Sequence, residues 1–134
     1  MTKKIFEVWL DYAADDLKSA EVLLQARIYS MVCFHAQQAV EKTLKAILAA
    51  AEQPIPRLHN LVRLRRLVED ALGHSLSIAE EALMFLNDVY LDSRYPTDLG
   101  VLPSGLPNPE DARRAYEYAL TIYESLGLIF KKLE

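Results

Sequence analysis

The stretch SMVCFHAQQAVEKTLKAILAA, residues 30–50, places apolar side chains three or four positions apart along its whole length. This spacing predicts a helix with one apolar face, and Ser30 is its expected N-cap. Gln37, Glu41 and Lys45 fall on the opposite side of that face and form the polar side of the helix. The prolines that follow the stretch end the helix, because proline cannot continue its hydrogen-bond pattern.

Four further helices follow from the same periodicity and from signals at the helix ends. One runs over about 2–26, and a shorter one, Leu61–Leu72, ends at Gly73. A capping box at Ser77–Glu80 opens the fourth helix, and the last helix covers 108–133, with an asparagine cap at its start. No segment alternates apolar and polar residues over the length of a strand. The predicted fold class is therefore all-α, a five-helix bundle.

The composition is that of an ordinary globular protein. The chain has 134 residues, 51% of them hydrophobic and 25% charged, with a net charge of −4. We therefore expect one domain over residues 1–134, with no general attraction to nucleic acid. Cys33 is the only cysteine, which excludes a disulfide framework and favours a reducing compartment. Because no export signal and no apolar stretch of membrane length is present, the expected location is the cytoplasm, with no membrane partner.

Most catalytic signatures are missing from the sequence. The four glycines do not form a dinucleotide-binding fingerprint or a phosphate-binding loop. No spacing of carboxylates and histidines supports a metal centre, so we expect neither a metal nor a cofactor. Cys33 and His35 point in different directions on one helix, which favours a core role for Cys33. His35 and His74 are interpreted as structural or surface residues.

The segment Asp92–Asp98 marks the exit from the fourth helix, and a long loop rich in proline and glycine follows it as far as Asn108. A proline forces Tyr95 out of helical geometry and holds Arg94 at a fixed exit. Arg94 could bind phosphate oxygens in a bidentate manner, and Tyr95 could stack on a base. Alternatively, Arg94 pairs with Asp92, with Asp98 or with a carbonyl group at the C-terminal end of the helix, and Tyr95 fills a surface groove.

A basic stretch, Arg57–Arg66, holds four arginines and one histidine and no acidic residue. Arg63 and Arg66 share a helix face and could present positive charge to RNA or to an acidic partner. The alternative is a solvated helix face that the two following acidic residues balance. His59 stands at the helix entrance, where an imidazole nitrogen can also accept a backbone N–H group as a cap.

Four segments of the chain occur in an order typical of one known family. They are, in chain order, ADDLKSAE at 14–21, FHAQQAVEKTLKA at 34–46, His59-Asn-Leu, and SRYP at 93–96. Together they resemble the HEPN family of small helical domains. The resemblance implies a five-helix up-and-down bundle that forms a homodimer. It also implies pairing with a minimal nucleotidyltransferase as toxin and antitoxin, with the HEPN protein as the toxin.

Many members of that family are metal-independent ribonucleases, in which a histidine follows an arginine within a few residues and the pair faces the same pair of the other protomer. No histidine follows Arg94 in this sequence. Arg94 can still bind phosphate, and His59 or Asp98 could replace the missing base if the fold brings them near. The resemblance also makes adenylylation of Tyr90 or Tyr95 by the partner conceivable.

Three hypotheses for the function follow. The favoured one is a dimeric module that binds a nucleotide or RNA, with these ligand-binding residues: Arg94, Tyr95, Asp98, His59, Arg63 and Arg66. The second is a divergent endoribonuclease toxin that needs no metal and uses Arg94 at the dimer interface. The third is a purely structural interaction partner.

Overall fold

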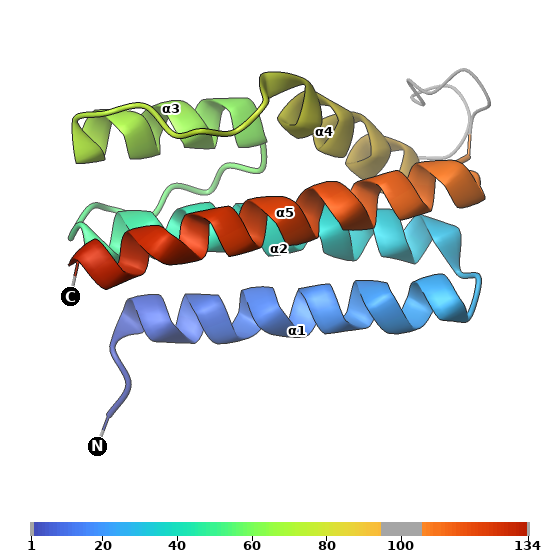
Figure 1. Cartoon of the computed structure of the whole chain (residues 1–134), viewed down its shortest axis with the longest axis horizontal. Coiled ribbons are helices and arrows are strands. Elements are labelled where there is room, and N and C mark those ends of the chain that lie inside the picture. The colour runs from blue at the N-terminus through green and yellow to red at the C-terminus, as the bar shows by residue number, and fades with distance from the viewer. Residues whose placement is uncertain (1, 95–105, 134) are drawn as a thin grey trace.

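The computed structural model describes residues 2–94 and 106–133 of the chain. Within these residues the chain forms five helices and no strand: α1 (Ile5–Gln25), α2 (Tyr29–Ala50), α3 (Leu61–Leu72), α4 (Glu80–Arg94) and α5 (Pro109–Leu133). The predicted all-α class is confirmed (Figure 1). A membrane-spanning helix is absent from the described part, since none of the five combines the necessary length with enough apolar character.

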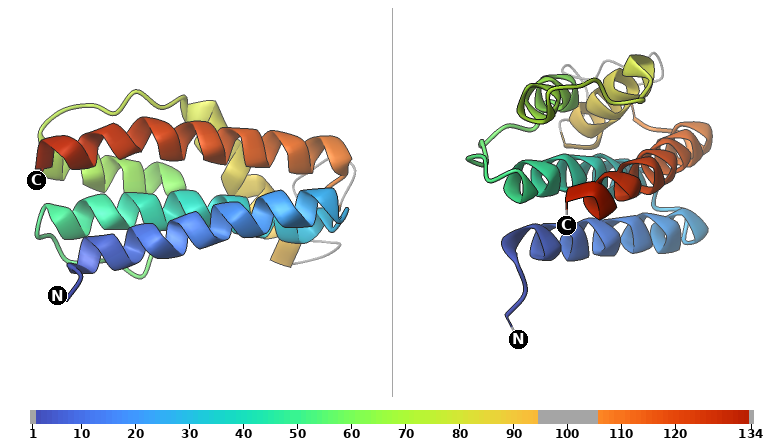
Figure 2. Two further views of the ribbon diagram at one scale, coloured as in Figure 1. Left: turned by 60° about the horizontal axis from the view of Figure 1, so that its bottom comes forward. Right: turned by 60° about the vertical axis from the view of Figure 1, so that its left-hand side comes forward.

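α2 lies at the centre of the bundle and contacts each of the other four helices. α2 and α5 form a middle layer, with α1 on one side and with α3 and α4 on the other (Figures 1 and 2). The side chains of Val40, Leu44 and Ile47 on α2 are fully buried. They belong to one apolar core to which all five helices contribute. The other four helices therefore cover most of the surface of α2.

The helix ends confirm two of the predicted caps and correct two others. Asn108 and Asp111 form a reciprocal box at the start of α5, with bonds of 3.0 and 2.8 Å between backbone N–H groups and side-chain oxygens. Ser30 is not the N-cap of α2, because that helix begins one residue earlier, at Tyr29. The capping box predicted at Ser77–Glu80 is also wrong. α4 begins at Glu80, whose carboxylate accepts a hydrogen bond from an arginine of α3 instead.

Three of the helices are followed by a residue whose backbone has left-handed geometry, with a positive φ angle. This geometry occurs at Gly73 after α3, as predicted, with φ 78°. The same geometry occurs at two non-glycine residues, Arg27 after α1 with φ 63° and Glu52 after α2 with φ 58°. The backbone N–H groups of Glu52 and Gln53 close a Schellman motif onto the last turn of α2, at 3.0 and 2.8 Å. This turn directs residues 51–60 back along the bundle, so that α3 runs in the same direction as α2 (Figure 1).

A hydrogen bond also joins α1 and α5. The hydroxyl group of Tyr116 donates to Glu21 Oε2 at 3.2 Å. Burial, and then the bond to Glu21, raise the pKa of Tyr116 above its ordinary value. Hydrogen bonds from Lys18 and Tyr116 lower the pKa of Glu21. The bond is therefore kept around neutral pH. It is lost as the pH rises through the pKa of Tyr116 or falls through that of Glu21.

Replacing Glu52 by glycine is expected to raise the free energy of unfolding by about 1 kcal/mol, because left-handed backbone costs an L-residue roughly that much. Gly73→Ala is expected to lower it by a similar amount for the same reason. An added Cβ at Gly73 has no atom within 4 Å, so a steric clash does not contribute. Urea denaturation of both variants measures the two changes. A destabilised Glu52→Gly variant would contradict the assigned backbone geometry.

Candidate functional site

Glu41, in the middle of α2, accepts hydrogen bonds from four side chains. Its Oε1 atom accepts from Gln37 and Gln38 Nε2 at 3.3 Å each and lies 3.0 Å from His59 Nδ1. Its Oε2 atom accepts from Lys45 Nζ at 3.0 Å. The Glu41 and Lys45 side chains are only 5% and 7% exposed, so they form a buried ion pair. We call Glu41 and its four partners the Glu41 network.

Burial of the Glu41 network corrects a sequence prediction. Gln37, Glu41 and Lys45 were expected on the polar side of α2, but their exposed fractions are 0%, 4% and 6%. Two other segments contact this side of α2. Gln37 Nε2 donates to the His59 carbonyl oxygen at 2.8 Å, and Lys45 Nζ lies over the Trp9 ring of α1, 5.9 Å from its centre. Desolvation of a buried ion pair is costly unless further hydrogen bonds satisfy its atoms. No buried side-chain nitrogen or oxygen in the described part of the chain lacks a partner.

His59 links the Glu41 network to a column of aromatic rings. Its side chain is 61% exposed, and its ring lies 5.9 Å from the Tyr90 ring of α4. Tyr90 in turn stacks on Phe34 of α2, also at 5.9 Å, with an interplanar angle of 18°. A carboxylate can only accept hydrogen bonds, so the Nδ1 atom of His59 carries the proton and donates to Glu41. In the neutral ring, Nε2 is then free of a proton and can accept one.

A second polar cluster joins α1 to α2. The Asp16 carboxylate lies 2.7 Å from His35 Nδ1 and accepts a hydrogen bond from Lys42 Nζ at 2.6 Å. Asp16 itself is only 7% exposed. Lys42 also lies over the Tyr12 ring, at 5.9 Å from its centre. The cluster places His35 in a structural role, as expected, because each of its polar members holds one helix against the other.

The start of α3 is fixed by two asparagines rather than by His59. The side-chain oxygen of Asn60, the N-cap residue, accepts the backbone N–H of Arg63 at 3.1 Å. The backbone N–H of Leu61 donates to Asn87 Oδ1 of α4 at 3.0 Å. The interpretation of His59 as a helix cap is therefore wrong, because its ring is bonded to Glu41.

The residues predicted around the exit of α4 are described only in part. Arg94 is the last residue of α4, one helical turn after Tyr90, and its side chain lies outside the described part. Tyr95 and Asp98 also lie outside the described residues. The structure therefore brings His59 to α4 one turn before Arg94. Tyr90 is itself 7% exposed, so a modifying enzyme would reach its hydroxyl group only after local opening.

The residues of the basic stretch Arg57–Arg66 lie on different surfaces of the fold. His59 faces the Glu41 network, whereas Arg63 and Arg66 line a separate small cavity beside α3. Arg65 points to the start of α4, where it donates to the Ile78 carbonyl oxygen at 2.9 Å and to Glu80 at 2.8 Å. The six predicted ligand-binding residues are therefore not shown to form one site.

The sequence model of the HEPN domain matches residues 6–129, nearly the whole chain. The chain belongs to the HEPN domain family. The matched region includes every residue of the Glu41 network and the described part of the α4 exit. Two of the segments that suggested the family from the sequence meet in the Glu41 network: the α2 segment 34–46, with Gln37, Glu41 and Lys45, and His59-Asn-Leu, with His59.

Two solved structures share the fold of this HEPN protein. TT1696 from Thermus thermophilus is 26% identical, with a TM-score of 0.73, and the match covers 93% of this chain and 98% of that one. ST0689, an archaeal HEPN homologue, is 24% identical, with a TM-score of 0.68 and 100% of both chains covered. No curated protein matches the sequence.

The described part of this HEPN protein holds one exposed histidine that a buried carboxylate orients. Among residues 2–94 and 106–133, no three histidine, cysteine, aspartate or glutamate side chains gather as metal ligands would. His59, in contrast, has one nitrogen fixed by a buried carboxylate and most of its ring exposed. The same side chain can stack on a planar ligand, donate or accept a hydrogen bond, or accept a proton.

Glu41→Ala is expected to destabilise the protein by about 3 kcal/mol or more, because it leaves Lys45 buried without its counter-charge. The double variant Glu41→Ala/Lys45→Met is expected to regain a large part of that loss, since no buried charge remains. Thermal and urea denaturation measure both. If the double variant is no more stable than the single one, Lys45 does not depend on Glu41 and the network is wrongly assigned.

Proposed function

We propose that this HEPN protein is a dimeric module that binds a nucleotide or RNA where His59, Tyr90 and the end of α4 meet. HEPN domains usually have functions related to nucleotides or RNA, and they commonly dimerise. The observation that carries the proposal is the exposed His59 ring, which Glu41 holds beside Tyr90, one turn before Arg94. An exposed imidazole ring beside a tyrosine that precedes an arginine by one helical turn suits a base and its phosphate group.

In this proposal each predicted site residue has a separate task. Arg94 binds phosphate oxygens and Tyr95 stacks on the base. His59 and Asp98 supply polar contacts to the sugar or the base. Arg63 and Arg66 line a different cavity and bind a different ligand.

We further propose that residues 1–134 act as one domain in the cytoplasm. There the protein would be the HEPN component of a toxin–antitoxin pair, with a minimal nucleotidyltransferase as its partner. Family membership and the Arg-Tyr-Pro sequence after α4 support this assignment. A nucleotidyltransferase partner would be expected to co-purify with the chain and to suppress its toxicity.

Arg94→Ala is expected to weaken binding of a fluorescent oligouridylate about tenfold, which corresponds to one lost charge-assisted contact of about 1.4 kcal/mol. The free energy of unfolding should change by less than about 0.5 kcal/mol, because a side chain that acts only on the ligand contributes little to folding. Fluorescence anisotropy over a range of salt concentrations measures the affinity. The slope of log K against the logarithm of the salt concentration should decrease by the amount that corresponds to about one phosphate contact.

Arg113→Ala is the matched control for this measurement, because Arg113 is an exposed arginine at the start of α5. It should leave the affinity unchanged. If Arg94→Ala lowers the free energy of unfolding by as much as it weakens the free energy of binding, the arginine has a structural role. If ATP and oligouridylate both fail to bind the wild type, the chain is a structural interaction partner and the proposal fails.

The His59–Glu41 pair favours one second candidate, a ribonuclease that needs no metal. A carboxylate that fixes Nδ1 leaves Nε2 of His59 in the form that can take a proton from a ribose hydroxyl group. Arg94 would then stabilise the charge on the phosphate. In this alternative His59 replaces the histidine that the family places after the arginine.

Cleavage of RNA in the presence of EDTA separates the two candidates. A ribonuclease of this type should cut RNA with EDTA present and lose the activity in both His59→Ala and Arg94→Ala. The binding module should leave RNA intact in all three proteins. Cleavage that persists in His59→Ala would remove His59 from the mechanism.

A further inference from the structure

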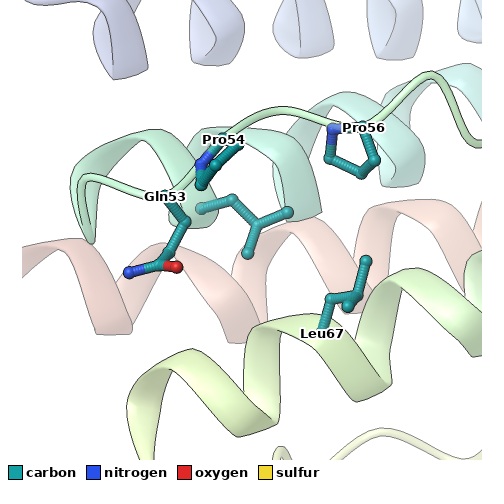
Figure 3. Close-up of a pocket in the computed structure, with 5 residues that line it drawn as sticks. Gln53, Pro54, Pro56 and Leu67 are labelled. Carbon is teal, nitrogen blue, oxygen red and sulfur yellow. The ribbon is translucent and has the colours of Figure 1, made fainter.

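An apolar groove lies between the returning segment 51–60 and the outer face of α3, and we call it the Leu67 groove. Its larger cavity has a volume of about 280 Å³ and is lined by Leu48, Gln53, Pro54, Pro56 and Leu67. A smaller cavity of about 130 Å³ shares Leu67 and is lined by Leu58, Arg63, Arg66, Leu67 and Asp70. Figure 3 shows Pro54 and Pro56 on one side of the larger cavity and Leu67 on the other.

Leu67 differs from the other leucines in the middle of α3. Leu61 and Leu64 are fully buried, whereas Leu67 is 40% exposed. It lies outside the apolar core and one turn from Arg63 along the outer face of the helix. An exposed leucine beside Arg63 and Arg66, opposite a wall of prolines, leaves apolar surface that no part of the described chain covers. The prolines also fix the backbone of that wall, so little conformational entropy is lost when a ligand enters.

The charge beside this groove is positive although the chain as a whole carries −4. Arg63 and Arg66 are exposed, and neither forms an ion pair among the described residues. Arg65, between them, is already neutralised by Glu80. Asp70 is the one acidic residue that lines the two cavities. The groove therefore offers two unpaired guanidinium groups next to an apolar hollow.

We propose that the Leu67 groove binds an acidic segment of a partner protein that inserts an aliphatic side chain between Pro54, Pro56 and Leu67. Carboxylates beside the inserted side chain pair with Arg63 and Arg66, so charge complementarity fixes the partner's position. RNA fits less well, because no aromatic residue lines either cavity to stack on a base. The groove shares no residue with the His59 and Tyr90 surface, so this proposal does not depend on nucleotide binding.

The test uses the full-length, ¹⁵N-labelled protein and a short peptide of glutamate and aspartate with two adjacent leucines at its centre. Titration followed by ¹H–¹⁵N spectra reports which backbone amides respond. We expect saturable shifts at residues 53–58 and 63–70 that weaken as salt is raised, because screening reduces the attraction. The same peptide with serine for leucine, or with glutamine for glutamate, should bind about tenfold more weakly.

Variants of the groove complete the test. Arg66→Glu and Leu67→Ser should each reduce the affinity about tenfold, and both sites are exposed, so folding is retained. Arg113→Glu and Leu128→Ser are the matched controls, on the exposed face of α5, and should bind like the wild type.

Three results would overturn the proposal. The first is the absence of saturable shifts at millimolar peptide. The second is an oligouridylate that shifts the same amides at lower concentration than the peptide, which would make the groove an RNA site. The third is concentration-dependent dimerisation that Leu67→Ser abolishes, which would show that a second copy of the chain covers the groove.

Discussion

The structure depends on one buried carboxylate. Glu41 sits on the central helix, pairs with Lys45, and accepts a hydrogen bond from the ring of His59. Gln37 adds a bond to the His59 backbone, so two residues of α2 hold the end of the returning segment 51–60. Because the segment is held there, Pro54 and Pro56 form a wall of the Leu67 groove and His59 reaches Tyr90. Both proposed binding surfaces therefore rest on the same interaction.

This arrangement explains how a small helical bundle can present two different surfaces. Residues 51–60 form an extended segment between α2 and α3, and neighbouring side chains on it face different ways. His59 is bonded to the Glu41 network, whereas Leu58 lines the cavity beside Arg63. One surface offers the exposed ring of His59, which suits a base. The other offers aliphatic side chains and arginines, which suits an acidic protein segment.

Periodicity predicted the five helices and their approximate limits, because apolar spacing and caps such as Asn108 and Gly73 are local signals. It did not predict that the polar side of α2 is buried, since the residues that contact this side, such as Trp9 and His59, lie elsewhere in the chain. For the same reason, the sequence did not predict that the residues of the basic stretch lie on two different surfaces. Spacing placed Arg63 and Arg66 on one face of a helix, but only the fold separates them from His59. The family resemblance had singled out two segments that meet in the network, the Gln-Gln-Ala-Val-Glu-Lys run and His59-Asn-Leu.

The tautomer of His59 tests the central claim most directly. A long-range ¹H–¹⁵N correlation spectrum, recorded where the ring is neutral, distinguishes a proton on Nδ1 from one on Nε2. The bond to Glu41 predicts that the proton resides on Nδ1, and that Glu41→Gln, whose amide can also donate, changes this signal. A proton on Nε2 in the wild type would contradict the account, because His59 would then make no donor bond to the buried carboxylate.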